Sequence, residues 1–185
     1  MAKHGSIRII GGQWRGRNLP VPEASGLRPT TDRVRETLFN WLAPRIHGAR
    51  CLDMFAGSGI LGIEALSRGA GWVDFLELSP SVARAIAGQL NKLNASQCQV
   101  STANALGWQA ETPCDVVFID PPFDAGLADA ALEHLLNSAL VAPDSRIYLE
   151  VRASDQHTVT DPRLSVLRDK KAGDVHYRLL EVLAH

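Results

Sequence analysis

The four residues Asp120-Pro121-Pro122-Phe123 could do chemistry together, because they combine a carboxylate, a rigid backbone turn and an aromatic ring. They follow residues 116–119, an apolar run with the length and composition of a buried strand. The two prolines cannot continue that strand, and their fixed φ stiffens the turn. We therefore expect the Asp120 carboxylate and the Pro121 carbonyl to act as fixed hydrogen-bond acceptors at the end of a strand.

Two such acceptors suit an aromatic amino group, for example N2 of guanine or N6 of adenine. The lone pair of this nitrogen is delocalised into the ring, so the nitrogen is a poor nucleophile. Acceptors that bind both of its hydrogens shift electron density onto the nitrogen and orient its lone pair, which is positional and electrostatic catalysis. The amine then loses a proton as it becomes cationic, to Asp120 or to water, while Phe123 stacks on the base. The alternative is a turn that merely ends a strand.

A second candidate site lies in residues 53–59, where a strand-like run at 51–55 breaks into a glycine-rich loop. In open α/β sheets, ligands bind at the carboxyl ends of the strands. Gly57 and Gly59 let the backbone approach a ligand closely, and the start of the next helix presents free N–H groups. Gly62 completes a literal G-x-G-x-x-G pattern. That pattern alone is weak evidence for NAD or FAD.

Asp53 favours a different cofactor. A carboxylate here would repel the pyrophosphate of a dinucleotide, whereas it would attract an ammonium or a sulfonium. S-Adenosylmethionine carries both cations and has no phosphate. Glu77, at the end of the next strand, can accept both ribose hydroxyls, and Asn104, after the third strand, can accept from the adenine amino group. Each residue also has a simpler interpretation. Asp53 could be a strand-end cap, Glu77 a solvated charge, and Asn104 part of a turn.

The predicted site contains no metal, and its residues fall into two sets. The catalytic set is Asp120, Pro121, Pro122 and Phe123. The cofactor-binding set is Thr30, Asp53, Phe55, Ala56, Gly57, Ser58, Gly59, Glu77, Leu78, Asn104 and Ala105.

The elements that must position these loops alternate between strand and helix patterns from residue 50 onward. The expected strands are 51–55, 72–77, 97–101, 115–120, 146–151, 165–167 and 175–183; the expected helices are 60–70, 80–93, 127–139 and, less regular, 105–110. Such alternation predicts parallel strands joined by crossover helices. The short link 168–174 predicts an antiparallel hairpin for the last two strands. The predicted fold is a Rossmann-like, mostly parallel seven-stranded sheet with helices on both faces.

The front of the chain has a separate pattern. Residues 6–22 read as two short strands around Gly11-Gly12, a pair that supplies the positive φ of a tight hairpin turn. A helix should begin near Thr31 or Asp32, either of which is a competent N-cap. Its apolar face has helical spacing and consists of Val34, Leu38, Trp41 and Leu42. We expect two parts: an N-terminal hairpin arm over 1–27 and a main domain over 28–185.

Charge is distributed unevenly along the chain, although the net charge is only −1. Residues 1–50 hold nine Lys or Arg against three acids, so the remainder holds ten against seventeen. A basic front on an acidic body suggests a polyanionic partner at one end of the molecule, and the alternative is a solvated basic face.

Several residues of this front are candidates for contact with RNA. Arg8, Arg15 and Arg17 on the hairpin can follow phosphates, and Trp14 can stack on a base or else pack against the body. Arg33 and Arg35 lie off the apolar face of their helix, so we expect them to face RNA or solvent.

Composition excludes several other classes of protein. The chain has 185 residues, 45% of them hydrophobic, which is enough for one sizeable core. No apolar run approaches the roughly 18–20 residues that span a membrane, and the N-terminus lacks the apolar core of a signal peptide. Its three cysteines form no C-x-x-C pair, so buried packing is favoured over zinc binding or thiol catalysis. We expect a cytoplasmic enzyme, by default a monomer.

These motifs resemble known families at two levels. Residues 53–59, Glu77 and 120–123 resemble the motifs of class I amino-methyltransferases, which carry [D/N/S]-P-P-[Y/F/W]. The front resembles more specifically the 16S ribosomal RNA guanine(966)-N2 methyltransferase family, and amino-methyltransferases of DNA do not share these front motifs. In this chain, the two front motifs are Arg8-Ile9-Ile10-Gly11-Gly12-x-x-Arg15-Gly16-Arg17 and Arg28-Pro29-Thr30-x-Asp32-x-Val34-Arg35-Glu36-x-Leu38-Phe39-Asn40. Together with 52–70, the resemblance spans essentially the whole chain.

The resemblance implies guanine N2 as the target, 16S rRNA of the small ribosomal subunit or its assembly intermediate as the substrate, and S-adenosylhomocysteine as the by-product. It also implies that residues 28–40 cover the cofactor and border the active site. Asn104 departs from the pattern, since relatives commonly carry Asp there, although a neutral acceptor still suits the adenine amine. The tail fits the family only loosely. With Lys170 and Lys171 from that tail, the predicted RNA-binding set is Arg8, Trp14, Arg15, Arg17, Arg28, Arg33, Arg35, Lys170 and Lys171.

Three alternatives remain open on the residues alone. A methyltransferase that acts on adenine N6 or cytosine N4 of DNA would use the same loops, and only the front segment argues against it. A nicotinamide oxidoreductase would use the literal G-x-G-x-x-G. A catalytically silent RNA-binding or assembly factor would share the basic front.

Overall fold

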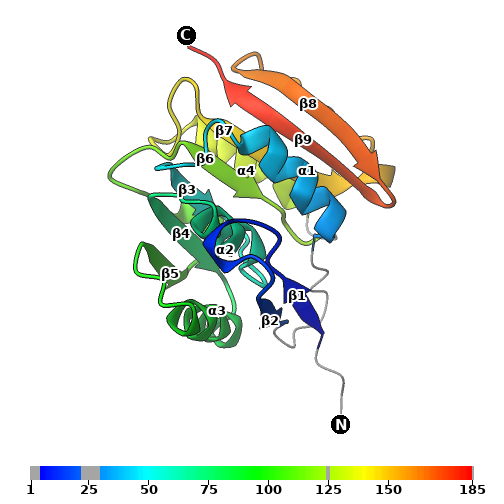
Figure 1. The fold of residues 1–185 in the computed structure, drawn as a ribbon. Helices are drawn as coiled ribbons and strands as arrows, with labels where there is room; N and C mark the ends of the chain where they lie inside the picture. The colour runs from blue at the N-terminus through cyan, green and yellow to red at the C-terminus, as the bar shows by residue number, and fades with distance from the viewer. Residues whose placement is uncertain (1–4, 22–29, 124–125, 185) are drawn as a thin grey trace.

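The computed structural model describes residues 5–21, 30–123 and 126–184. Its centre is a seven-stranded sheet in the order β5-β4-β3-β6-β7-β9-β8 (Figure 1). Strands β3 to β7 run parallel, and β9 is antiparallel to both of its neighbours. The strands are β3 (Arg50–Asp53), β4 (Trp72–Glu77), β5 (Cys98–Thr102), β6 (Val116–Ile119), β7 (Arg146–Arg152), β8 (Leu164–Ala172) and β9 (Val175–Val182). The predicted Rossmann-like fold is confirmed.

Two hydrophobic cores lie on opposite faces of this sheet. One contains the apolar faces of α1 (Asp32–Leu42), α2 (Ile60–Ser67) and α3 (Pro80–Lys92). The other contains α4 (Leu127–Leu136) and the short 3₁₀ helix η2 (Ala105–Gly107), which stands where a longer helical stretch was expected. Strand β6 shows the division, because Val116 and Phe118 belong to the first core and Val117 and Ile119 to the second. Helices therefore cover both faces, as predicted.

Helix α1 begins where its capping residues require. The Thr31 side chain accepts a hydrogen bond from the Val34 N–H at 3.4 Å, which satisfies one of the unpaired N–H groups of the first turn. Val34, Leu38 and Leu42 are buried as predicted. The helix ends at Leu42, before Pro44.

The N-terminal hairpin forms, but not through a tight turn. Strands β1 (Ser6–Arg8) and β2 (Asn18–Pro20) pair antiparallel, and residues 9–17 join them through a 3₁₀ turn, η1 (Gly12–Trp14). Gly11 is extended, whereas Gly12 has a φ of +75°. A Cβ on Gly12 would lie 1.8 Å from the carbonyl oxygen of Ser67. The predicted tight Gly-Gly turn is wrong, because Gly12 serves the close approach of the hairpin to α2.

The C-terminal hairpin is longer than predicted. Strand β8 continues to Ala172, which pairs with Val175 at the start of β9, so Gly173 and Asp174 form a two-residue turn. Gly173 has a φ of +57°, the positive value that such turns require. Lys170 and Lys171 therefore lie on the edge strand β8 and not in a loop.

Two further observations concern the lengths of the helices and the state of the cysteines. No helix within the described ranges is both long and apolar enough to span a bilayer. Cys51 and Cys114 are buried, Cys98 is half-buried, and all three are free thiols.

Candidate active site

The candidate site lies where the sheet changes direction. Strand β3 is central: the chain builds β4 and β5 on one side of it and then returns to place β6 and β7 on the other. The loops after β3 and β6 therefore emerge side by side at the carboxyl edge, the position where open α/β sheets bind ligands. A cavity of about 600 Å³ opens there. It is lined by the whole predicted catalytic set and by every predicted cofactor residue except Gly59.

The glycine-rich loop takes the conformation that its glycines permit. Gly57 and Gly59 have φ values of +52° and +77°, and Gly59 is the N-cap of α2. Gly62 serves helix packing and not the conformation of the loop. A Cβ there would lie 2.2 Å from Cε1 of Phe75, so this glycine lets α2 pack closely on β4. The loop thus brings the N-terminus of α2 to the cavity wall.

Asp53 lies at the bottom of this loop with only 2% of its surface exposed. Its Oδ2 accepts a hydrogen bond from the Gly62 N–H at 3.1 Å. The pKa of Asp53 is raised to about 7, mainly by burial and in smaller part by the nearby Glu77 carboxylate, while the Gly62 hydrogen bond opposes the shift. The carboxyl group therefore both caps the first turn of α2 and lines a cavity in which a cationic ligand would stabilise its ionised form.

Because the pKa of the buried Asp53 is raised, we expect the free energy of unfolding to depend on pH. The folded protein holds the Asp53 proton more tightly than the unfolded chain, so unfolding releases it between about pH 4 and pH 7, and stability falls as pH rises through that window. Asp53→Asn keeps an acceptor for Gly62 and should raise the free energy of unfolding at pH 8 by about 1–3 kcal/mol in the absence of ligand. Urea unfolding at pH 8 and pH 4 measures this. A variant that is less stable than wild type at pH 8 would contradict the assignment.

Glu77 anchors the glycine loop to the end of β4. Its Oε2 accepts from the Gly57 N–H at 3.0 Å, and its Oε1 accepts from the Ser79 N–H at 2.8 Å. The alternative of a simply solvated charge is therefore wrong. Each carboxylate oxygen has a second lone pair, so hydroxyl groups of a ligand can still donate to Glu77.

Asn104 and Leu78 form the far rim of the cavity. Asn104 Oδ1 accepts from the Leu106 N–H at 3.1 Å and caps η2, which is the turn chemistry considered as the alternative. Its contact with adenine stays a prediction. Leu78 is 73% exposed, the highest value among the large hydrophobic residues in the described part of the chain. An apolar side chain held at a cavity rim suits the face of a planar ring.

Asp120 lies opposite the glycine loop and has a partner that the sequence did not assign to it. Thr30 Oγ1 donates a hydrogen bond to Asp120 Oδ2 at 2.8 Å. Burial raises the pKa of Asp120 well above its usual range, Glu150 raises it further, and the Thr30 bond lowers it. The expected contact of Thr30 with the cofactor stays a prediction; what the structure shows is that Thr30 binds the predicted catalytic acceptor.

The remaining residues of the Asp-Pro-Pro-Phe turn frame a second hollow. Pro121 is buried, Pro122 is exposed and Phe123 is half-buried. The Arg152 guanidinium carbon lies 5.6 Å from the Phe123 ring centroid, a cation–π distance. A hollow of about 390 Å³ adjoins the main cavity and shares Pro121, Pro122, Phe123 and Glu150 with it. Space for a ligand therefore exists on both sides of this turn.

Glu150 is the site residue that the sequence analysis missed. It is 4% exposed, lines both hollows and accepts a hydrogen bond from the Tyr148 hydroxyl at 2.6 Å. Strands β6 and β7 pair Ile119 with Leu149, so Asp120 and Glu150 follow in neighbouring positions at one edge. A signal was present in the sequence, because Glu150 is an acid between the apolar residues Leu149 and Val151 near the end of a strand.

The predicted RNA-binding residues divide into two groups. Arg8, Arg15, Arg17, Arg33, Lys170 and Lys171 are exposed, and Arg28 lies outside the described residues. Trp14 is only 8% exposed and packs in the first core, so its ring is not free to stack on a base in this conformation. Arg35 is fully buried, and the prediction that it faces RNA or solvent is wrong.

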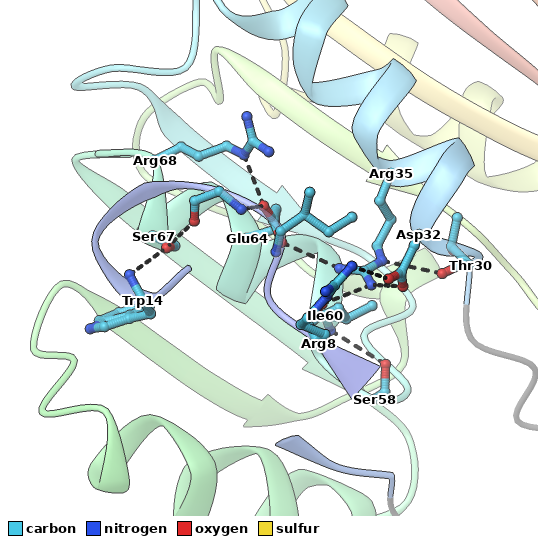
Figure 2. Close-up of polar contacts among 12 residues, drawn as sticks. Arg8, Trp14, Thr30, Asp32, Arg35, Ser58, Ile60, Glu64, Ser67 and Arg68 are labelled. Atoms are coloured by element: carbon cyan, nitrogen blue, oxygen red, sulfur yellow. Dashed lines mark hydrogen bonds and ion pairs between the residues drawn. The ribbon is translucent and has the colours of Figure 1, made fainter. Parts of the chain in front are cut away.

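Arg35 is buried because Glu64, on α2, pairs with it. Figure 2 shows the Glu64 carboxylate between Arg35 and Arg68. Glu64 Oε2 lies 3.3 Å from Nη1 of Arg35, and Oε1 lies 2.9 Å from Nε of Arg68. The same carboxylate accepts from the backbone N–H groups of Ile10 and Gly11 at 2.9 and 2.7 Å. Glu64 thus ties the N-terminal hairpin, α1 and α2 together at one buried point.

Other contacts extend this junction along the hairpin. Arg35 also donates to the backbone oxygens of Thr30 and Arg8 and pairs with Asp32 at 2.6 Å. Ser67 Oγ donates to the Gly11 carbonyl at 2.6 Å and accepts from the Trp14 N–H at 3.0 Å. The hairpin is therefore docked on α2 through hydrogen bonds that satisfy its own backbone.

The fold, the glycine-rich loop and the Asp-Pro-Pro-Phe turn define a class I methyltransferase. A family model described as conserved hypothetical protein 95 matches residues 7–181, and the chain belongs to this family. Ribosomal RNA small subunit methyltransferase D of Escherichia coli strain K12 is 48% identical, over 96% of this chain and 90% of that one. The protein of the same name from Haemophilus influenzae is 46% identical, over 96% and 94%. A solved structure from Escherichia coli has a TM-score of 0.90 at 45% identity and covers 98% of this chain and 100% of its own.

Proposed function

We propose that this enzyme transfers a methyl group from S-adenosylmethionine to the exocyclic N2 of a guanine in 16S rRNA of the small ribosomal subunit. The observation that carries the proposal is that Asp120 and Pro121 line the same cavity as the glycine-rich loop, while Thr30 holds the Asp120 carboxylate through Oδ2. The relatives named as ribosomal RNA small subunit methyltransferase D support the RNA target. Such a substrate places the enzyme in the cytoplasm.

The residues of the cavity fit this cofactor. Asp53 would face its cationic amino-acid end, Glu77 its ribose hydroxyls, and Leu78 with Asn104 its adenine ring. Bound there, S-adenosylmethionine supplies an electrophilic methyl group on a sulfonium and leaves as S-adenosylhomocysteine. Among the described residues, no cluster of His, Cys, Asp and Glu could hold a metal ion.

Asp120 and Pro121 would then act on the amino group of the base. Their two oxygens accept its two hydrogens, which directs the nitrogen lone pair toward the cofactor end of the cavity. As the N–CH₃ bond forms, the nitrogen becomes cationic and one proton passes to the Asp120 carboxylate or to water. Phe123 would stack on the base from the side that Arg152 does not cover.

The exposed cations define the proposed RNA surface. Arg8, Arg15 and Arg17 lie on the hairpin, Arg33 on α1, and Lys170 and Lys171 on β8. The Lys170 ammonium lies 5.8 Å from the ring of Trp41, which links the edge strand to α1. We propose that residues 1–27 form an RNA-binding arm, in which Ile10 and Gly11 bind Glu64 of the main domain. Arg28 remains in the proposed set.

The Thr30 hydroxyl should set the pH range of activity. Only the carboxylate form of Asp120 accepts from the amine, so activity falls as pH decreases through its raised pKa. Thr30→Val removes a hydrogen bond that favours the carboxylate by about 1–2 kcal/mol, so kcat/KM at pH 6 should fall about 5–30-fold, with a smaller loss at pH 8. Thr30→Ser should retain the wild-type profile. An unchanged profile for Thr30→Val would show that this bond does not tune Asp120.

Methyl transfer to purified particles tests the function directly. Small subunits from cells lacking the protein should accept one labelled methyl group per particle from S-adenosylmethionine, whereas adenine- and cytosine-containing DNA should accept none. Label in DNA alone would refute the RNA assignment. Thermal stabilisation by NAD and not by S-adenosylhomocysteine would refute the methyltransferase assignment.

A further inference from the structure

We propose that Glu150 selects guanine by accepting the hydrogen of its ring N1, next to the amino group that Asp120 and Pro121 hold. This inference rests on the proposed function and adds a residue that determines base specificity. The carboxylate of Glu150 belongs to the wall of both hollows that meet at the Asp-Pro-Pro-Phe turn.

The position of Glu150 follows from strand register. Ile119 of β6 pairs with Leu149 of β7, and the next residue of each parallel strand is an acid. The negative charge of Glu150 acts directly on Asp120 and raises its pKa. Two acidic groups at neighbouring strand ends therefore face one ligand space, and Glu150 itself is 96% buried by its neighbours, with 4% of its surface exposed.

A hydrogen bond from Tyr148 holds the Glu150 carboxylate. The Tyr148 hydroxyl donates to Oε2 at 2.6 Å, which requires Glu150 to act as an acceptor there. Tyr148 is itself fully buried, and its ring lies 6.4 Å from that of Tyr177, which stacks on Trp41 at 5.4 Å. A carboxylate has about four lone-pair positions, so the same group can accept a hydrogen bond from Tyr148 and one from a ligand.

The chemistry of the base edges makes this acceptor selective. Guanine presents three donors side by side, the ring N1–H and the two hydrogens of N2, and three acceptors meet them: Glu150, Asp120 and the Pro121 carbonyl. In adenine and cytosine, the ring nitrogen beside the amino group is an acceptor. A carboxylate facing that nitrogen loses a hydrogen bond and adds repulsion, so the same residue favours guanine and disfavours the other two bases.

The test replaces the target base without removing its amino group. 2-Aminopurine keeps the N2 amine, but its N1 is an acceptor without hydrogen. Small-subunit particles reconstituted with 16S rRNA carrying guanine or 2-aminopurine at the modified position are compared under single-turnover conditions. Wild-type enzyme should prefer guanine about 100-fold in kcat/KM, as expected for a buried acceptor left without its donor.

Glu150→Gln should reverse most of that preference. Its amide oxygen can still accept from Tyr148, while its amide hydrogens can donate to N1 of 2-aminopurine. We expect guanine methylation to fall about 10–100-fold and the guanine to 2-aminopurine ratio to shrink at least tenfold. Binding of S-adenosylhomocysteine and the thermal midpoint should stay near the wild-type values, which separates this role from a structural one.

Tyr148→Phe provides the matched control. It removes the support of Glu150 and keeps the carboxylate, so it should lower the rate on both bases and leave the ratio in favour of guanine. An unchanged ratio in Glu150→Gln would overturn the role of Glu150 and leave the proposed function standing. Wild-type enzyme that methylates guanine in neither particle nor free 16S rRNA would overturn the proposed function itself.

Discussion

Replacing Asp120 with alanine should lower kcat for methyl transfer about 10²–10⁴-fold while leaving affinity for S-adenosylhomocysteine within about threefold of wild type. The carboxylate is the acceptor that polarises the amine, and the proposed cofactor contacts come from other loops. Removal of a buried acid with a raised pKa should not destabilise the fold above neutral pH. Radiolabelled methyl transfer and calorimetric titration measure the two quantities on the same preparation.

Asp120→Asn sharpens the interpretation of that result. The amide keeps one oxygen acceptor of similar position but carries no negative charge, so its activity should lie between those of wild type and Asp120→Ala. Equal activity in wild type and Asp120→Ala would contradict the role of the turn. Lost cofactor binding in Asp120→Ala would assign the residue to binding instead of catalysis.

Replacing Glu64 with alanine should have the largest effect on stability, a loss of about 3–5 kcal/mol in the free energy of unfolding. Glu64 is fully buried, and its removal takes one of two acidic partners from the buried Arg35 guanidinium and leaves the N–H groups of Ile10 and Gly11 without their acceptor. For a chain of this size, the thermal midpoint should fall by roughly 6–20 °C. Differential scanning calorimetry at neutral pH measures it.

A matched substitution on the same side of the molecule provides the control. Glu36→Ala removes an exposed glutamate from α1 and should change stability by no more than about 0.5 kcal/mol. Replacing Arg35 and Glu64 together with leucine removes both buried charges and should cost clearly less than the sum of the two single changes. Strict additivity would show that the pair does not act as a unit.

Local sequence patterns are sufficient to predict the central strands of the sheet and the two loops that form the site. The loop at 53–59 and the turn at 120–123 each end a short apolar strand, and parallel topology brings such ends to one edge. Strand β4 has the predicted bounds, and β7 ends one residue later than predicted. Local periodicity determines such elements because burial on both faces of a parallel strand leaves a continuous apolar run.

The errors concern residues whose environment depends on distant partners. Helical spacing places Arg35 off the apolar face, yet Glu64 of another helix compensates its charge in the interior. Trp14 and Gly12 are fixed by Ser67, more than fifty positions away in the chain. Such pairings leave no periodic signal in either segment. Glu150 was missed for a related reason, since a single acid in an apolar run acquires meaning only beside Asp120.

Mapping the modified nucleotides of 16S rRNA from cells that lack this protein tests the central claim most directly. Mass spectrometry of nuclease fragments should show the loss of one N2-methylguanosine and no other change in ribosomal RNA. Wild-type protein should restore that nucleotide, and Asp120→Ala, expressed at the same level, should not. An unaltered set of 16S rRNA modifications, or a methyl group missing from DNA instead, would contradict the assignment.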